Sequence, residues 1–195
     1  MEVRGMLFIY ILLVLCFSGD GIISPVQSRY YSSRAHRKPM TEKITHLHFF
    51  LHDILSGANP SAVEVASPAT AAVGGDESNP TPFGHVYAIN DLLTDGPEAT
   101  SKVVGNAQGM YLSSGRETPS LVMYVDFGFT TGKFNGSSIG VFSRNPITEP
   151  NFREEAVVGG RGKLRMARGF AKVRTSYLNI TNGDAILEYF VTVFH

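Results

Sequence analysis

The chain has 195 residues, of which 43% are hydrophobic and 17% are charged, and its 17 basic residues balance its 17 acidic residues. This length and composition fit one globular domain with a sizeable core. A formal net charge of zero leaves no basic field to attract phosphates, which argues against a nucleic-acid-binding protein.

Residues 1–23 have the pattern of a secretory signal peptide. Arg4 precedes an unbroken apolar run from Met6 to Phe17, and small and polar residues follow it. The run of about twelve residues is shorter than the ~20 that span a bilayer, so a membrane anchor is the weaker interpretation. We expect cleavage between residues 18 and 28 and a secreted, extracellular protein.

The mature chain is expected to lack cysteine, because Cys16 lies within the signal peptide. Disulfides, a thiol nucleophile and thiolate metal sites are then excluded. Residues 24–43 are polar and basic without periodicity and predict a flexible N-terminal arm. The folded domain is expected over residues 44–195.

Short strands separated by turns account for the rest of the chain. The expected strands are rich in Val, Ile, Phe and Tyr, and Gly, Pro, Asn, Asp and Ser lie between them. We expect strands at 44–55, 61–67, 84–92, 103–113, 120–130, 137–144, 163–175 and 184–194. This pattern predicts an all-β fold, an eight-stranded antiparallel up-and-down β-barrel whose central cavity holds a small ligand.

Three connections between the strands have recognisable patterns. The long Pro-rich stretch 68–83 is either a functional lid or a mobile loop. The segment Gly159-Gly160-Arg161-Gly162 lacks the Lys-Ser/Thr of a phosphate loop, so we expect a tight turn between strands. Two sequons, at Asn135 and Asn179, fall in predicted turns and favour glycosylation of a secreted chain.

The first strand carries two different faces. Alternation places Leu47, Phe49, Leu51 and Asp53 on one face and His46, His48, Phe50 and His52 on the other. His46 and His48 are close enough to share a metal ion, but His52 is ~13 Å further along the strand. We therefore favour outward-facing or inter-subunit histidines and expect neither a metal nor a cofactor.

Two charged residues interrupt apolar strand faces. One is Asp53, and the other is Arg168, which is in phase with Leu164, Met166 and Phe170 along 163–175. A lone buried charge is costly, so the two either form a structural ion pair or stay hydrated in a cavity. In a cavity they would bind or protonate a phenol-sized ligand. The residues alone leave both interpretations open.

Three motifs resemble the plant dirigent protein family. They are His-Leu-His-Phe-Phe-Leu-His-Asp-Ile-Leu-Ser-Gly at 46–57, Gly-Asn-Ala-Gln-Gly-Met-Tyr at 105–111 and Glu-Ala-Val-Val-Gly-Gly-Arg-Gly-Lys-Leu-Arg-Met-Ala-Arg-Gly-Phe at 155–170. The resemblance covers about 45–195. It implies a secreted, glycosylated, eight-stranded barrel that assembles as a homotrimer in the apoplast.

The resemblance also implies a phenylpropanoid function without intrinsic oxidase activity. A separate laccase or peroxidase makes phenoxy radicals from monolignols, and the barrel orients two of them so that one stereoisomer of a lignan forms. Some relatives are instead pterocarpan synthases, which dehydrate and cyclise an isoflavanol through quinone methide chemistry. A non-catalytic protein of the cell wall, of lignin deposition or of plant defence is a third alternative.

Matching positions imply the site residues. Asp53, Tyr111 and Arg168 resemble the catalytic cavity residues of the family, and the expected substrate-binding residues are Leu47, Phe49, Leu51, Asp91, Met166 and Phe170. A carboxylic acid that protonates a quinone methide oxygen, beside a cation and a phenol, would direct its closure. Pinoresinol-forming members carry an acid where this chain has Lys163, which favours the non-pinoresinol branches and an Asp53 without a second carboxylate.

Overall fold

The structure, a computed structural model, describes residues 41–69 and 81–195. The expected signal peptide, residues 24–40 of the expected arm and residues 70–80 of the 68–83 loop lie outside the described residues. Within the described part, no helix is long and apolar enough to cross a membrane.

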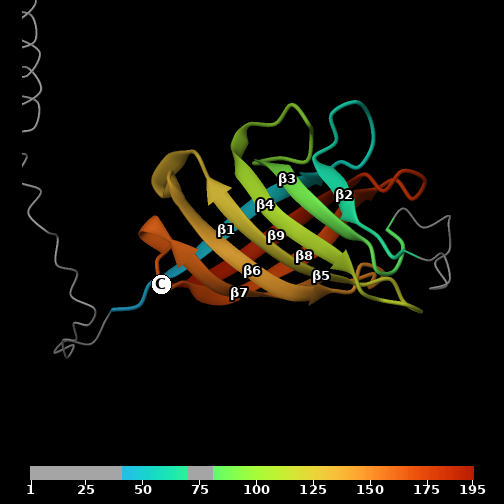
Figure 1. Cartoon of the computed structure of the whole chain (residues 1–195). Coiled ribbons are helices and arrows are strands. Elements are labelled where there is room, and N and C mark those ends of the chain that lie inside the picture. The colour runs from blue at the N-terminus through green and yellow to red at the C-terminus, as the bar shows by residue number, and fades with distance from the viewer. Residues whose placement is uncertain (1–40, 70–80) are drawn as a thin grey trace, which may run out of the picture. The chain divides into compact units, whose positions relative to one another are not determined.

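Nine strands form one antiparallel sheet that closes on itself. They are β1 (Ile44–Asp53), β2 (Ala62–Ala66), β3 (Val86–Thr94), β4 (Val103–Ser113), β5 (Leu121–Phe129), β6 (Ser137–Asn145), β7 (Arg153–Arg161), β8 (Arg168–Leu178) and β9 (Ala185–Phe194), with short 3-10 turns η2 (Gly132–Phe134) and η3 (Gly162–Leu164). Figure 1 shows the strands following one another around the barrel, with β1 returning beside β9. The predicted all-β, up-and-down barrel is therefore confirmed, with one strand more than expected.

The barrel closes because β1 and β2 pair with the same edge of β3, one after the other. Residues 50–52 of β1 pair with residues 92–94 of β3. The short strand β2 pairs with residues 86–89 of β3. Because β1 and β2 share one position beside β3, nine strands fill eight positions around the barrel. Closure leaves few unpaired strand edges.

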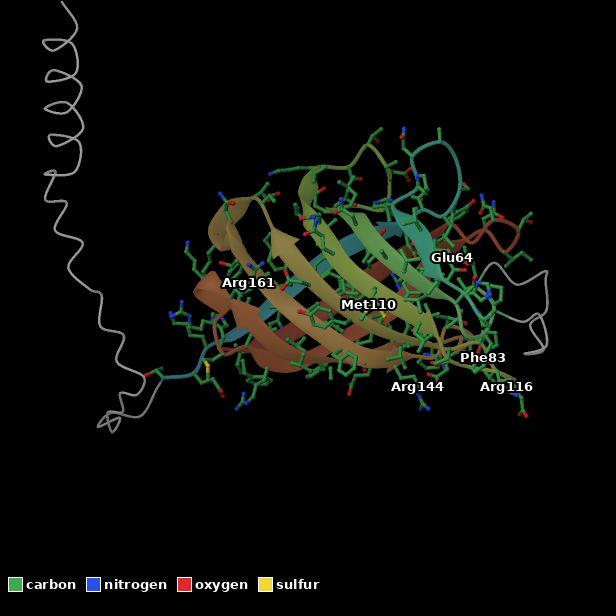
Figure 2. All side chains as sticks on the ribbon, viewed as in Figure 1. Glu64, Phe83, Met110, Arg116, Arg144 and Arg161 are labelled. Carbon is green, nitrogen blue, oxygen red and sulfur yellow. The ribbon has the colours of Figure 1, made fainter. Side chains whose placement is uncertain are left out.

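The antiparallel register gives the barrel two distinct ends. At one end of the barrel, which we call the cavity end, lie the last residues of β1, β4, β6 and β8, namely Asp53, Ser113, Asn145 and Leu178. The turns η2 and η3 lie at the opposite end, which we call the far end. In Figure 2, Arg161 marks the far end, and Arg116 and Arg144 mark the cavity end.

Aromatic rings fill the middle of the barrel. Phe49 stacks on Tyr189 with ring centroids 5.4 Å apart, and Phe127 meets Phe49 edge-on at 5.2 Å. All three side chains are at most 2% exposed. Alternation along each strand directs these residues inward, as predicted for Phe49, and their burial dominates the energetics of a core of this kind.

The expected turn at Gly159–Gly162 is wrong, because residues 153–161 form the strand β7. Gly159 and Gly160 continue the strand, and a Cβ on Gly160 would lie 2.3 Å from the carbonyl oxygen of Leu164. Gly160 therefore permits a close approach of backbones rather than a turn. Charged residues at the start of the strand hid its alternation.

The expected strand 163–175 begins too early. Residues 162–164 form η3, and β8 starts only at Arg168. Consequently Ala171 and Val173 are buried inside, whereas Arg168 is exposed and Met166 is 74% exposed. Arg168 and Phe170 share a face as expected, but it is the outer face of β8. Leu164 and Met166 do not belong to that face, because they precede the strand and Leu164 is part of the 3-10 turn.

Candidate functional site

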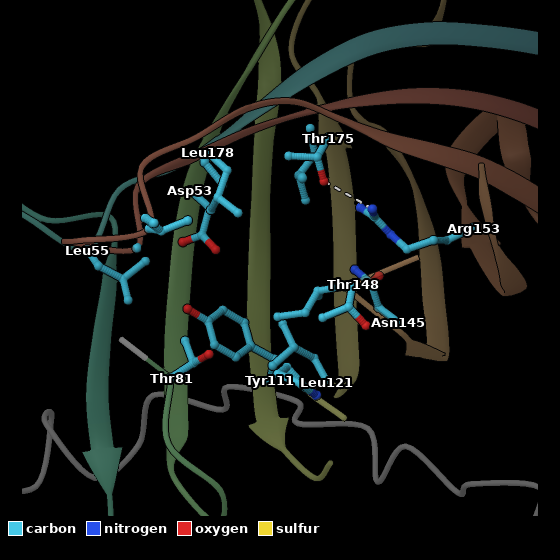
Figure 3. Close-up of a pocket in the computed structure, with 16 residues that line it drawn as sticks. Asp53, Leu55, Thr81, Tyr111, Leu121, Asn145, Thr148, Arg153, Thr175 and Leu178 are labelled. Carbon is cyan, nitrogen blue, oxygen red and sulfur yellow. Dashed lines mark hydrogen bonds between the residues drawn. The ribbon is translucent and has the colours of Figure 1, made fainter. Parts of the chain in front are cut away.

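A cavity of about 420 Å³ opens at the cavity end of the barrel. This volume lies within the usual range for small-molecule sites. Polar groups reach it from five strands, and Figure 3 shows Asp53, Tyr111, Asn145, Arg153 and Thr175 around it. Most of the remaining wall is apolar and consists of Leu55, Pro119, Leu121, Ile147, Leu178, Ile180, Ala185 and Leu187.

Asp53 and Tyr111 form one wall of the cavity. Asp53 is the last residue of β1, and Tyr111 lies near the end of β4. Figure 3 shows the Asp53 carboxyl and the Tyr111 hydroxyl pointing toward one another. Among the described residues, neither the buried Oδ1 of Asp53 nor the buried Oη of Tyr111 has a hydrogen-bond partner within normal geometry. The two groups are nevertheless close enough for the hydroxyl to act on the carboxyl, because Tyr111 lowers the pKa of Asp53.

Burial makes the Asp53 carboxyl a weak acid. It raises the pKa of Asp53 from 3.8 to about 7, while the Tyr111 hydroxyl lowers this pKa and the charge of Asp184 raises it. Burial and the charges of Asp53 and Asp91 raise the pKa of Tyr111 well above its ordinary value. Asp53 thus carries a transferable proton near neutral pH, beside a phenol that stays neutral.

Arg153 supplies a cation on another wall of the cavity. Its side chain is 2% exposed, and its Nη1 donates to Thr175 Oγ1 at 3.0 Å, the dashed line in Figure 3. Its Nε and Nη2 have no hydrogen-bond partner among the described residues, and neither has Oδ1 of Asn145, which also lines the cavity. A buried guanidinium with free donors is suited to an anionic or carbonyl oxygen of a ligand.

Glu155 lies on the same face of β7 as Arg153 and is fully buried. Neither of its carboxylate oxygens has a hydrogen-bond partner among the described residues. Burial raises the pKa of Glu155 to about 7, and the charge of Arg153 and the hydroxyl of Tyr189 lower it. Arg153 and Glu155 were missed in the sequence because β7 was missed, although their i, i+2 spacing was a signal of one shared face.

Asp91 is a second interior acid close to Asp53. It is 1% exposed and does not line the cavity, which differs from its expected place beside the substrate. Burial raises the pKa of Asp91 to about 8, the charge of Asp53 raises it further, and the hydrogen bond from Ser61 lowers it. An acid from β3 therefore lies near Asp53, but Asp53 is the one acid among the described residues that line the cavity.

The structure does not bring Arg168 to Asp53. Arg168 lies at the far end, where its Nη1 is 2.8 Å from Glu42 Oε1 and its guanidinium lies over the Phe194 ring. Lys163 is also at the far end, and its Nζ donates to the carbonyl of Lys133. The ion pair considered for Asp53 and Arg168 does not form, since they occupy opposite ends of the barrel.

The other expected substrate-binding residues also lie outside the cavity lining. Phe49 and Leu51 are in the buried core, with Leu47 packed against it. Met166 is exposed, and Phe170 lies on the outer side of β8.

The histidines of β1 face outward, as expected for His46 and His48. His46 Nδ1 is 3.0 Å from Thr192 Oγ1, and His48 Nε2 is 2.8 Å from Glu188 Oε1. His52 differs, because it is buried against Thr94. No group of three or more His, Cys, Asp or Glu among residues 41–69 and 81–195 is arranged to hold a metal ion.

Two loops are tied together at the mouth of the cavity by Asp184. Its Oδ1 accepts hydrogen bonds from the backbone N–H groups of Leu55 and Ser56, at 2.9 and 3.0 Å. Asn182 also donates to its Oδ2. These contacts join the β1–β2 loop to the β8–β9 loop, and Leu55 and Ile180 from these loops line the cavity.

The chain matches the dirigent-like protein family over residues 44–194. It is 50% identical to dirigent protein 15 of Arabidopsis thaliana over 169 residues, which cover 85% of this chain and 87% of that protein. It is 44% identical to pterocarpan synthase 1 of Glycyrrhiza echinata over 176 residues, which cover 89% of this chain and 91% of that protein.

A solved structure has the same fold. The pterocarpan synthase dirigent protein GePTS1 is 44% identical, with a TM-score of 0.76 over 85% of this chain and 99% of that one. The family match spans the whole described barrel, and the relatives align over nearly their full length. The chain therefore belongs to the dirigent-like protein family.

Proposed function

We propose that the barrel binds a phenolic alcohol of the isoflavanol type and, using Asp53 as the acid, converts it through a quinone methide to a cyclic ether. The observation that carries this proposal is the Asp53 carboxyl, protonated near neutral pH and facing Tyr111 in an apolar cavity. The 44% identity to two pterocarpan synthases supports the same reaction class.

In the proposed reaction Asp53 gives its proton to the leaving hydroxyl. The carbon–oxygen bond breaks, water leaves, and the conjugated phenol loses its proton to become the carbonyl of the quinone methide. A second phenol hydroxyl of the same ligand then adds to the methide carbon, while its proton goes to the carbonyl oxygen. The phenol proton passes to solvent and the Asp53 carboxylate takes one proton back, so the net change is the loss of one water.

Arg153 and Tyr111 have separate roles in this proposal. The free Nε and Nη2 of Arg153 bind the phenolic oxygen on which negative charge develops. The Tyr111 hydroxyl orients the alcohol at Asp53. Catalytic roles for Asp53 and Tyr111 remain as the family resemblance implies, whereas Arg153 takes the place of Arg168 as the cation at the cavity.

The test is turnover of an isoflavanol by the purified protein with no oxidant present. Chiral chromatography should show one enantiomer of the cyclised product, and Asp53→Asn should lower the rate about 100-fold or more. Glu154→Gln, an exposed acid on the outer side of β7, is the matched control and should leave the rate unchanged. Equal rates for Asp53→Asn and the unaltered chain would remove Asp53 from the mechanism.

The second candidate is stereoselective coupling of phenoxy radicals that a separate laccase or peroxidase makes from monolignols. The apolar wall of the cavity favours it, since radicals couple unaided and need orientation more than a lower barrier. Coniferyl alcohol and a laccase, with and without the protein, should then give one lignan enantiomer in excess. Racemic products here together with no isoflavanol turnover would favour the non-catalytic cell-wall alternative.

Secretion and glycosylation are part of the proposal. Asn135 is exposed at the far end, and Asn179 lies in the β8–β9 loop at the cavity end. Expression in plant cells should deliver the chain to the apoplast, with N-terminal cleavage between residues 18 and 28. Mass spectrometry before and after removal of N-glycans, with Asn135→Gln and Asn179→Gln, measures the use of each sequon.

A homo-oligomer, a trimer by family resemblance, is supported by one outer face of the barrel. Met110, Tyr124 and Phe142 are paired across β4, β5 and β6 and are 54%, 45% and 55% exposed. A contiguous exposed apolar row of this kind is typical of a protein contact. Light scattering should report a trimer for the unaltered chain and a smaller species for Tyr124→Glu, and a monomeric unaltered chain would contradict the assignment.

A further inference from the structure

The barrel wall has a seam at Asp91. Leu92 is the residue of β3 that pairs with His52 of β1, and Ile89 is the one that pairs with Ala62 of β2. Between these pairs, the N–H of Asn90 donates to the carbonyl of Ser61. The loop residue Ser61 thus fills the place where β1 has ended and β2 has not begun.

The side chains of Ser61 and Asp91 are hydrogen-bonded at this seam. Ser61 Oγ donates to Asp91 Oδ1 at 2.6 Å and accepts the N–H of Ile54 at 3.0 Å. Outside the wall lies a second hollow of about 420 Å³, the outer hollow, which both residues line. Its wall also includes Asn59, Asn90 and the buried His52. The pair therefore reaches a solvent-open space that is separate from the ligand cavity.

The same carboxyl faces the interior of the barrel, because Asp91 shares the buried face of β3 with Ile89 and Leu93. It lies one residue past the His52–Leu92 pair, which places it beside Asp53. The charge of Asp91 raises the pKa of Tyr111 from β4 and of Tyr189 from β9. The charge of Asp53 raises the pKa of Asp91 in turn. Asp91 therefore interacts with groups on both sides of the wall. Its charge acts on Asp53 inside the barrel, and its carboxyl accepts a hydrogen bond from Ser61, which lines the outer hollow.

We infer that Asp91 and Ser61 form a proton relay through the barrel wall, which connects Asp53 to water in the outer hollow. The inference rests on the proposed function, in which Asp53 gives up a proton while a ligand fills the cavity. Asp91 gives its proton to the Asp53 carboxylate through the interior. Ser61 passes its hydroxyl proton to Asp91 and takes one from water, which leaves hydroxide that the proton released by the ligand neutralises.

The relay removes a conflict in the site. A bound ligand covers Asp53 with apolar surface and excludes water from it, which favours the chemistry but closes the direct route for protons. A second route through the wall lets Asp53 regain its proton before the product leaves. Because Asp91 does not line the cavity, it acts on Asp53 and not on the substrate.

The experiment compares Asp91→Asn, Asp91→Ala and Ser61→Ala with the unaltered chain in isoflavanol turnover. Asp91→Asn should lower kcat about 10- to 100-fold with little change in KM, because proton delivery and not binding is lost. Formate should restore kcat of Asp91→Ala, since it fits the space left by the carboxyl group and can accept a proton and pass it on. Formamide has the same shape without the acid and should restore nothing. Glu154→Gln, an exposed acid on the outer side of β7, should be unaffected.

Three results would overturn the relay. They are an unchanged kcat in Asp91→Asn, equal restoration by formate and formamide, and loss of kcat in Asp91→Ala that no acid restores. A readout without turnover keeps the relay separate from the proposed function. With unreactive 4-propylphenol bound, time-resolved infrared spectroscopy after a pH jump should show Asp53 protonating fast in the unaltered chain and slowly in Asp91→Asn. Equal rates there would refute the relay even if the substrate class is wrong.

Discussion

Replacing Asp53 by Asn should make the folded chain more stable at neutral pH while it removes the acid. Asn has nearly the same shape as Asp and no ionised form, so the change isolates the effect of burying a carboxylate. Among the described residues Asp53 forms no ion pair, because Arg168 is at the far end of the barrel and Arg153, on another wall of the cavity, donates to Thr175. Replacing an active-site group that lowers the stability of the folded chain commonly raises stability and removes activity.

The magnitude follows from the pKa of Asp53, about 7 in the folded chain against 3.8 ordinarily. Because the folded pKa is the higher one, the folded chain binds more protons between these values, and stability falls as the pH rises through this window. At about 1.4 kcal/mol for each pKa unit, the full difference is about 4 kcal/mol, an upper bound because water and nearby groups relax. We expect Asp53→Asn to gain about 2 kcal/mol at pH values above about 7 and much less near pH 4.

Urea unfolding at about pH 4 and about pH 8 measures both values of the unfolding free energy. The unaltered chain should lose more stability between the two than Asp53→Asn, although Asp91 and Glu155 keep part of the slope because burial raises their pKa to about 8 and about 7. Glu154→Gln is the control and should follow the unaltered chain. An Asn variant that is no more stable at pH 8, with an unchanged slope, would refute the assignment of Asp53 as a destabilising buried acid.

Three further predictions concern the cavity and its mouth. Arg153→Met should lower kcat for the isoflavanol about 100-fold through loss of the oxyanion partner, measured at saturating substrate, and Arg153→Lys should restore only part of it. Tyr111→Phe removes a hydroxyl that lowers the pKa of Asp53, so the alkaline limb of the pH–rate profile should move to higher pH; a limb at lower pH would contradict this. Asp184→Ala breaks the hydrogen bonds between the mouth loops and should lower the unfolding free energy by about 1–2 kcal/mol and raise KM, seen by thermal melts and kinetics.

The strands show which side-chain directions alternation predicts correctly and which it does not. The inward positions of Phe49, Leu51 and Asp53 followed from a period of two, and the structure confirms the first two as core and the third at the cavity. The same rule misplaced Phe170 and Arg168, because a 3-10 turn that has no clear signal of its own lies before β8. A shift of one residue turns every side chain of a strand to the other face.

In the site, the sequence identified some residues correctly and others not. The acid Asp53 and the phenol Tyr111 were identified from matching motifs, and they meet in the cavity. The cation was assigned to Arg168 and is supplied by Arg153, from a strand whose charged first residues concealed it. The Lys163 position supplies no acid to the site, and Asp91, which the register of β3 places near Asp53, does not line the cavity.

The sequence by itself determined the all-β class, the domain from residue 44 and the family, because period, turn residues and motifs are local properties of the chain. Only the tertiary structure decided which end of the barrel each residue occupies, that β1 and β2 share one edge of β3, and which charges share the interior. Those facts depend on strand register and on closure, which join residues far apart in the chain. The pKa of Asp53 belongs to the second group, since burial raises it and no local pattern records burial.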